Sequence, residues 1–222
     1  LRSDSPVEMH SGQFVDIALE GFYLRRPISV CDCSGNSFTI IYKVVGEGTA
    51  VMSGMKEGER LEILTALGHG FDTDACSDSA LLVGGGLGAA PMYLLAKELI
   101  SKGRKVTAVL GFNKADEIML QEELSGLGAE VLISTVDGSV GTKGFVTDAL
   151  PENYTYFYTC GPEPMLKAVY KATSTSGQMS FEERMGCGFG ACMGCSCKTL
   201  TGYKRICKEG PVMKKEEILW ED

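Results

Sequence analysis

Five of the nine cysteines of this 222-residue chain lie close together near its C-terminal end. Four of them follow the pattern C-x4-C-x2-C with a later fourth cysteine, which is the spacing of plant-type [2Fe–2S] sites. Glycines between them permit positive φ angles, so the chain can wrap tightly and direct N–H groups at the sulfurs. The pattern predicts an iron–sulfur cluster with four thiolate ligands: Cys187, Cys192, Cys195 and Cys207.

Two other kinds of site stay open for these cysteines. A structural zinc usually shows two C-x2-C pairs separated by a longer stretch, whereas the first gap here is four residues. Disulfides are more typical of short secreted chains with an even number of dispersed cysteines. Cys197 could also replace Cys195 as a ligand, although the x2 spacing favours Cys195.

A glycine-rich segment stands between an apolar run and a helical one. Gly84, Gly86 and Ala89 satisfy the loose G-x-G-x-x-G/A form, in which glycines let the backbone approach a pyrophosphate at a helix N-terminus. The acid expected about 20 residues later is missing, because 103–105 is Gly-Arg-Lys. The segment therefore predicts either a nucleotide site or a packing turn. Its candidate nucleotide-binding residues are Gly84, Gly85, Gly86 and Gly88.

A second candidate for the nucleotide site ends a later apolar run. Cys160, Gly161, Pro162 and Met165 stand at the carboxyl end of an expected strand, where parallel sheets bind ligands. A buried cysteine before a turn is the alternative interpretation.

Composition excludes several classes of function. The net charge of −8 disfavours nucleic acid as a partner. Residues 79–96 are uncharged, as in a membrane span, but the internal glycines and Pro91 favour a buried strand, a turn and a helix. We therefore expect no membrane partner, and the odd, clustered cysteines favour a cytoplasmic location. The chain starts at Leu1 as if inside a domain, so we expect further N-terminal sequence.

Three regions of different pattern would position these residues. Residues 1–75 alternate short β-like runs with turns, which indicates a small antiparallel β domain. Residues 76–176 alternate apolar strands with helices, which indicates a parallel α/β sheet. Residues 177–222 have too little apolar sequence for a core and depend on their cysteines. The expected strands are 13–17, 37–45, 60–64, 80–83, 106–110, 131–134 and 154–159, and the expected helices are 91–101, 117–127 and 164–172.

The order of these motifs resembles a known family. Arg25-Arg26-Pro27-Ile28-Ser29, Ile41-Tyr42-Lys43 and Gly46-Glu47-Gly48-Thr49 look like the flavin-contacting stretches of the ferredoxin–NAD(P) reductase superfamily. Together with the glycine loop, Cys160-Gly161-Pro162 and the cysteine pattern, they cover essentially the whole chain. Within the superfamily, the chain resembles the electron-transfer subunits of NAD-linked (type B) dihydroorotate dehydrogenases.

The resemblance implies an α+β multi-domain protein that carries three cofactors. FAD would bind a small antiparallel β-barrel in 1–75, NAD an α/β parallel-sheet domain in 76–176, and a [2Fe–2S] cluster a small domain in 177–222. Arg26 would pair with the flavin pyrophosphate, Ser29 would lie near the flavin N5, and Cys160 near the nicotinamide. No catalytic side chain is expected, because the cofactors supply the hydride chemistry. The implied FAD contacts are Arg26, Pro27, Ile28, Ser29, Ile41, Tyr42, Lys43, Gly48 and Thr49. The family's first barrel strand is missing before Leu1.

The resemblance also implies a partner. This would be the FMN-containing dihydroorotate dehydrogenase catalytic subunit of pyrimidine biosynthesis, in a heterotetramer with two copies of each chain. Ile218–Trp220 beside the cluster would form an apolar docking surface, or Trp220 would pack back on the chain's own fold. NAD(H) would be preferred over NADP(H), with Lys114 as the alternative ligand of a 2′-phosphate. The alternatives are the small subunit of a ferredoxin–NADP transhydrogenase or sulfide-dehydrogenase-type reductase, and a zinc-stapled nucleotide-binding regulator.

Overall fold

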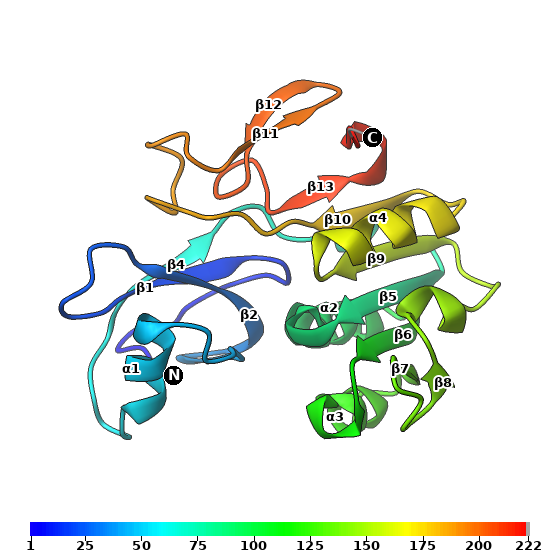
Figure 1. Ribbon diagram of the computed structural model, residues 1–222, viewed down its shortest axis with the longest axis horizontal. Coiled ribbons are helices and arrows are strands. Elements are labelled where there is room, and N and C mark those ends of the chain that lie inside the picture. Colours follow the sequence, from blue (N-terminus) through cyan, green and yellow to red (C-terminus); the bar gives the residue numbers. More distant parts are fainter. Residues whose placement is uncertain (221–222) are drawn as a thin grey trace.

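The computed structural model describes residues 1–220, and Figure 1 shows two sheets side by side with a small hairpin above them. The first sheet has four antiparallel strands in the order β3-β2-β1-β4. Val15 and Ile17 of β1 are fully buried on one face of the strand, and Phe14 and Asp16 on the other face are buried as well. The expected antiparallel β region is confirmed, with β3 and β4 as its edge strands among the described residues. Its elements are β1 (Phe14–Ala18), β2 (Arg26–Ser34), β3 (Ser37–Ile40), α1 (Glu47–Gly54) and β4 (Glu62–Leu67).

The second sheet has seven strands in the order β13-β10-β9-β5-β6-β7-β8. All its neighbouring strands are parallel except β13, which runs antiparallel to β10. Leu81, Leu82 and Val83 of β5 are fully buried, because apolar side chains cover both faces of the strand. The expected α/β sheet is thereby confirmed. Its elements are β5 (Ser79–Gly85), α2 (Ala89–Ser101), β6 (Lys105–Phe112), α3 (Gln121–Gly126), β7 (Glu130–Thr135), β8 (Thr142–Lys143), β9 (Tyr156–Cys160), α4 (Glu163–Ala172), β10 (Gly177–Ser180) and β13 (Val212–Lys214).

The C-terminal region contributes to two sheets. β10 and β13 extend the parallel sheet, although the sequence pattern assigned residues from 177 onward to a separate region. Only β11 (Ser196–Thr199) and β12 (Gly202–Arg205) form a sheet of their own. The loop with the first three cysteines leaves β10 and reaches this hairpin, so the parallel sheet anchors the cysteine region (Figure 1).

Helix α2 joins the two large sheets. Lys97 Nζ lies 2.9 Å from Oδ1 of Asp32 on β2, and the Ser11 hydroxyl donates to Glu98 Oε2 at 2.6 Å. Because α2 starts directly after the glycine-rich loop, these contacts hold that loop against the antiparallel sheet. No helix within residues 1–220 combines the length and the apolar character needed to cross a membrane.

Candidate functional site

Backbone N–H groups point at the sulfurs of the cysteine loop. Cys187 Sγ accepts from the amides of Ala191 at 3.2 Å and Cys192 at 3.4 Å. Cys195 Sγ accepts from the amide of Cys207 at 3.4 Å. Amides placed in this way stabilise negative charge on sulfur, which thiolate ligands of a metal cluster require.

The four predicted ligands lie in two pairs, Cys187 with Cys192 and Cys195 with Cys207. Burial opposes ionisation of Cys187, but the amides of Cys192, Phe189 and Ala191 outweigh it and lower its pKa to about 6. Burial and then the neighbouring Cys195 raise the pKa of Cys207 to about 12. Two thiol pairs fit a binuclear cluster, in which each iron takes two cysteines.

Within residues 1–220 no three acidic, histidine or cysteine side chains converge on one metal-ion position. Cys197 stands on β11, two residues beyond Cys195, and lines a different hollow.

A hollow of about 440 Å³ lies between the antiparallel sheet, the start of α2 and the cysteine region. It gathers eight of the nine residues implied as FAD contacts: Arg26, Pro27, Ile28, Ser29, Ile41, Tyr42, Lys43 and Thr49. Gly48 lies directly behind it, because a Cβ there would come within 2.1 Å of Arg26 Nε. The Arg26 guanidinium stacks over Phe22 at 4.7 Å from the ring centroid. The structure therefore assembles one cavity from three separate sequence stretches.

Other residues in this hollow were not predicted from the sequence. Phe14 of β1 and Met185 of the cysteine loop line it, and both also pack in the apolar cluster that contains Cys195 and Cys207.

The predicted Cys160 lines the same hollow from the opposite side. Its burial, together with the charge of Glu182, raises the pKa of its thiol to about 12. A neutral Cys160 thus stands where the nucleotide and flavin motifs meet.

A second hollow, of about 460 Å³, lies at the carboxyl end of the parallel strands. Of the predicted nucleotide residues it contains Gly85, Gly86, Pro162 and Met165. The other glycines act in packing: a Cβ on Gly84 would lie 2.9 Å from Ala89 Cα, and one on Gly88 would lie 2.1 Å from the Cys160 carbonyl oxygen.

Glu117 is the one charged side chain among the described residues that line this second hollow. Its Oε2 accepts from the Asn113 backbone amide at 3.2 Å and from Asn113 Nδ2 at 2.9 Å. Phe145 lines the same hollow and is 67% exposed. Neither residue was predicted, because Glu117 comes well after the position where the nucleotide fingerprint places its acid. Lys114 is paired with Asp116 at 2.8 Å and does not line the hollow.

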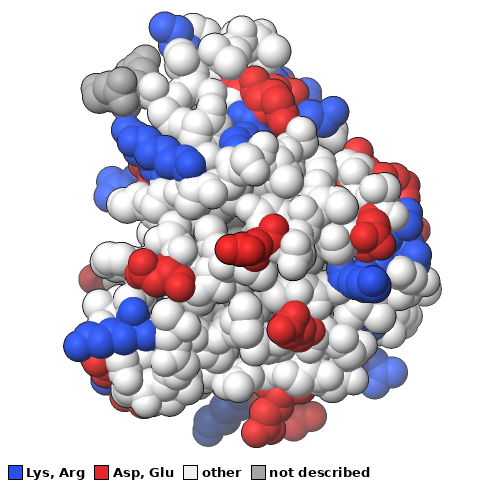
Figure 2. Space-filling model, turned by 90° about the vertical axis from the view of Figure 1, so that its right-hand side faces the viewer, with Lys and Arg blue, Asp and Glu red and all other residues white. Residues whose placement is uncertain are grey.

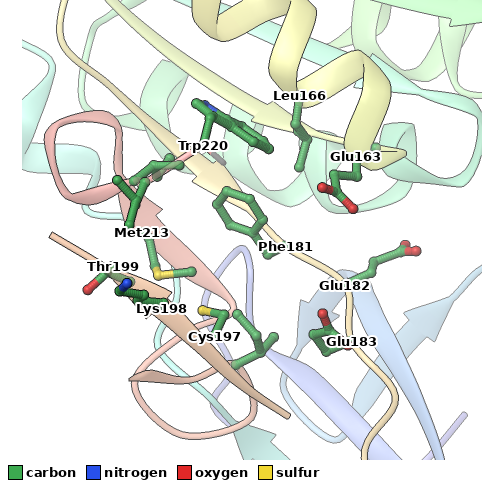
Figure 3. Close-up of a pocket in the computed structure, with 14 residues that line it drawn as sticks. Glu163, Leu166, Phe181, Glu182, Glu183, Cys197, Lys198, Thr199, Met213 and Trp220 are labelled. Atoms are coloured by element: carbon green, nitrogen blue, oxygen red, sulfur yellow. The ribbon is translucent and has the colours of Figure 1, made fainter. Parts of the chain in front are cut away.

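A third hollow, of about 300 Å³, lies between α4, β10 and the β11–β12 hairpin, and Gly161 lines it. Figure 3 shows the Trp220 and Phe181 rings next to each other in its lining. Trp220 packs on Phe181 and Tyr170 at 5.9 Å between ring centroids, and Ile218 is buried. Ile218 and Trp220 therefore pack against the chain's own fold, which favours the alternative interpretation of Trp220 over a free apolar docking surface. The exposed apolar residues of the cysteine region are Phe189, Met193, Leu200 and Tyr203.

Charged residues show no single dominant region on the face viewed in Figure 2, where basic and acidic side chains alternate with uncharged surface.

Comparison with known proteins identifies two family models in the chain. Residues 182–219 match the iron–sulfur cluster binding domain of dihydroorotate dehydrogenase B, and residues 82–171 match an oxidoreductase NAD-binding domain. The first match covers all four predicted cluster cysteines.

Curated relatives agree with these matches. The chain is 44% identical to the electron transfer subunit of dihydroorotate dehydrogenase B (NAD(+)) of Fusobacterium nucleatum, over 93% of this chain and 86% of that protein. It is 46% identical to the subunit of the same description from Lysinibacillus sphaericus, over 95% of this chain and 88% of that protein.

A solved structure of an NADH-dependent reduced ferredoxin–NADP oxidoreductase superposes with a TM-score of 0.86. It is 31% identical, over 96% of this chain and 80% of that one. Because this identity is lower than the 44% and 46% of the curated relatives, the transhydrogenase-type alternative ranks second. The match to an iron–sulfur binding domain favours a cluster over the zinc alternative. The predicted family is confirmed: this chain belongs to the electron transfer subunits of dihydroorotate dehydrogenase B.

Proposed function

We propose that this chain passes electrons between NAD and the FMN-containing catalytic subunit of dihydroorotate dehydrogenase, by way of a [2Fe–2S] cluster and FAD. One observation carries the proposal: the flavin-type hollow shares Phe14 and Met185 with the cysteine site and Cys160 with the nucleotide motif. The nucleotide motif, the flavin-type hollow and the cysteine site are therefore neighbours in that order, and electrons can pass from one site to the next. The oxidoreductase class agrees with the family to which the chain belongs.

The electron balance fits this arrangement. Oxidation of dihydroorotate to orotate releases two electrons and two protons. NAD⁺ takes both electrons and one proton as a hydride, and the other proton goes to solvent. When bound, a [2Fe–2S] cluster held by the four cysteines would supply one-electron transfer, and FAD held beside Arg26 would supply the exchange between single electrons and hydride. The protein holds, orients and insulates these groups, and no side chain reacts.

FAD is assigned to the 440 Å³ hollow. Arg26 offers a charged fork to the pyrophosphate, and α1 begins beside it. Thr49 fixes this helix start, because its Oγ1 accepts from the amides of Val45 at 2.9 Å and Gly46 at 3.2 Å. Ser29 is opposite Phe14 across β1 and β2, so both side chains lie on the face turned toward the cysteine region. The remaining contacts assigned to FAD are Pro27, Ile28, Ile41, Tyr42, Lys43 and Gly48.

The cluster is assigned to Cys187, Cys192, Cys195 and Cys207, and Cys197 is left out. The amide donors to Cys187 and Cys195 support this choice, because they favour thiolates at the two pairs.

NAD is assigned to the 460 Å³ hollow, with Gly85 and Gly86 at its pyrophosphate. Gly84 and Gly88 shape the loop, while Cys160, Gly161, Pro162 and Met165 border the nicotinamide half. Glu117 would accept hydrogen bonds from the ribose hydroxyls and repel a 2′-phosphate, which supports NAD(H) over NADP(H). The exposed Phe145 ring offers a stacking surface to adenine.

The partner is the catalytic subunit, in a heterotetramer with two copies of each chain in the cytoplasm. Phe189 and Met193 of the cysteine loop and Tyr203 of the hairpin are exposed around the cluster site and form an apolar surface for this contact.

Reconstitution tests the proposed function. The isolated chain should show flavin and cluster absorption and reduce ferricyanide with NADH, yet leave dihydroorotate unchanged. Addition of the FMN-containing subunit should couple dihydroorotate oxidation to NAD⁺ reduction. Dihydroorotate turnover by this chain alone would contradict the proposed division of labour. Failure to bind the subunit, with NADH–ferricyanide activity intact, would favour the transhydrogenase-type alternative.

A further inference from the structure

Asp16 is a buried carboxylate in the middle of β1 that lines neither the flavin nor the nucleotide hollow. The residue is 2% exposed, and its Oδ1 has no hydrogen-bond partner among the described residues. A carboxylate oxygen that is buried without a hydrogen-bond partner loses its hydration without compensation, so such groups are rare in cores without a role.

The register of β1 places Asp16 between two of the proposed cofactor sites. Asp16 lies opposite Pro27 of the flavin stretch and two residues from Phe14, so it shares the sheet face of Phe14. On that face its Oδ2 fills the space beside Gly188, where a Cβ would come within 2.3 Å of this oxygen. Gly188 has φ +74° and directly follows Cys187, so the carboxylate lies against the start of the cysteine loop.

The nearby cations do not neutralise Asp16. Burial outweighs the attraction of Arg25 and Arg26 and raises the pKa of Asp16 to about 6. Arg25 is paired with Glu62, and Arg26 donates to the Leu24 carbonyl. At neutral pH and above, Asp16 is therefore a mostly ionised group without a direct ion pair.

We propose that the Asp16 carboxylate lowers the reduction potential of the cluster held by the Gly188 loop. The inference rests on the proposed function, because it concerns the cluster assigned to Cys187 and its partners. Reduction adds one negative charge to the cluster, and a buried negative charge beside the loop opposes that addition. Asp16 thereby lowers the fraction of reduced cluster and favours electron transfer from the cluster to FAD.

Potentiometric titration of the holoprotein at pH 8, followed by EPR of the reduced cluster, tests this role. Asp16→Asn keeps the shape and removes the charge, so the cluster midpoint should become less negative. At the wild-type midpoint the reduced-to-oxidised ratio should rise roughly tenfold, the size expected when one buried charge beside the loop is removed. The FAD midpoint should move less. Asp4→Asn, an equal charge change at a side chain that is 92% exposed, should move neither.

Two further variants keep the inference testable if Asp16→Asn does not assemble the cluster. Asp16→Ser should raise the midpoint as well, and Asp16→Glu should keep it near the wild-type value. An unchanged midpoint in the neutral variants, or an equal shift at FAD, would overturn the inference. Loss of iron from both neutral variants, with retention in Asp16→Glu, would also overturn it, because the carboxylate would then be required to build the loop. Absence of any cluster signal in the wild-type protein would instead refute the proposed function.

Discussion

The four cysteines of the proposed cluster differ in their surroundings. Cys192 is exposed, whereas Cys195 and Cys207 are 2% exposed and pack with Phe14. Buried thiolates require compensation by hydrogen bonds or metal, because burial alone favours the neutral thiol. Two backbone amides donate to Cys187 in the outer pair, whereas one amide donates to Cys195 in the inner pair, so the buried inner pair depends more on the metal for its charge.

Replacement of single cysteines separates ligands from neighbours. Cys192→Ser should lose most of the cluster, because one iron would lose a thiolate, whereas the matched Cys197→Ser should retain it. Iron and sulfide content with visible absorption measure the outcome. Retention in Cys195→Ser together with loss in Cys197→Ser would reverse the assignment of those two residues.

Replacement of Arg26 probes the flavin site. Arg26→Ala should weaken FAD binding by roughly tenfold or more, because a phosphate would lose its charged hydrogen bonds. The FAD content after dialysis and a fluorescence titration of the apoprotein with FAD measure this affinity. Arg60→Ala, at a side chain that is 90% exposed in the same sheet region, is the matched control. Full FAD occupancy in Arg26→Ala would place the pyrophosphate elsewhere.

Glu117 carries the expected nucleotide preference. Glu117→Gln should lower the NADH-to-NADPH ratio of kcat/KM by roughly tenfold, because the amide no longer repels a 2′-phosphate. Ferricyanide reduction by each nucleotide gives the ratio. Glu122→Gln, on the first turn of α3, should leave it unchanged. An unaltered ratio in Glu117→Gln would mean that the ribose lies away from this carboxylate.

Sequence spacing predicts the cysteine set, and the resemblance to the reductase superfamily predicts the flavin stretches, which the fold brings to one hollow. Neither could predict Phe14, Asp16 or Glu117. Phe14 and Asp16 reach the cofactor region only through the pairing of β1 with β2 and the return of the cysteine loop. Glu117 lines the nucleotide hollow because its carboxylate accepts two hydrogen bonds from Asn113, which holds it near the end of β6.

At the scale of elements, the apolar strands and their helices could be predicted from periodicity, since buried parallel strands read as continuous apolar runs. α3 is shorter than expected, because 115–117 forms a separate 3₁₀ turn and Leu120 has φ +62°. β10 was missed as part of this sheet. Its sequence Gly-Gln-Met-Ser has no strand pattern, and only its hydrogen bonds with β9 and β13 make it a strand.

The buried charge on β1 should make stability depend on pH. The folded-state pKa of Asp16 is about 6 and the unfolded value is 3.8, so the folded protein binds this proton more tightly. Its contribution therefore falls as pH rises through 6, and the free energy of unfolding should be about 1 kcal/mol lower at pH 8 than at pH 5 from this group. Asp16→Asn should lack that difference in urea unfolding. The same pH dependence in wild type and variant would contradict the assignment.

At the scale of the whole molecule, the apolar core and the metal stabilise different parts. β5, β6 and β9 are buried on both faces, whereas the hairpin β11–β12 pairs with no other sheet among the described residues. Removal of iron should therefore loosen the cysteine loop and hairpin and leave the parallel sheet intact.

Hydrogen exchange before and after chelation measures this effect. Protection should fall roughly tenfold or more in 187–207 and stay constant in β5, β9 and β10. Equal loss in the hairpin and in β5 would show instead that the metal stabilises the entire fold.

The extension of the parallel sheet by β10 and β13 has a mechanical consequence. A continuous ladder of hydrogen bonds runs from β8 under the nucleotide hollow to β13 beside the cysteine loop. Strands joined in this way resist sliding, so the nucleotide hollow and the cysteine loop are held by one rigid frame. The antiparallel sheet meets that frame through side-chain contacts such as Lys97 with Asp32 and through an isolated backbone bridge between His69 and Pro211. A domain motion that changes the distance between cofactors should therefore move the antiparallel sheet and its flavin hollow. The nucleotide hollow and the cysteine loop should keep their positions relative to each other.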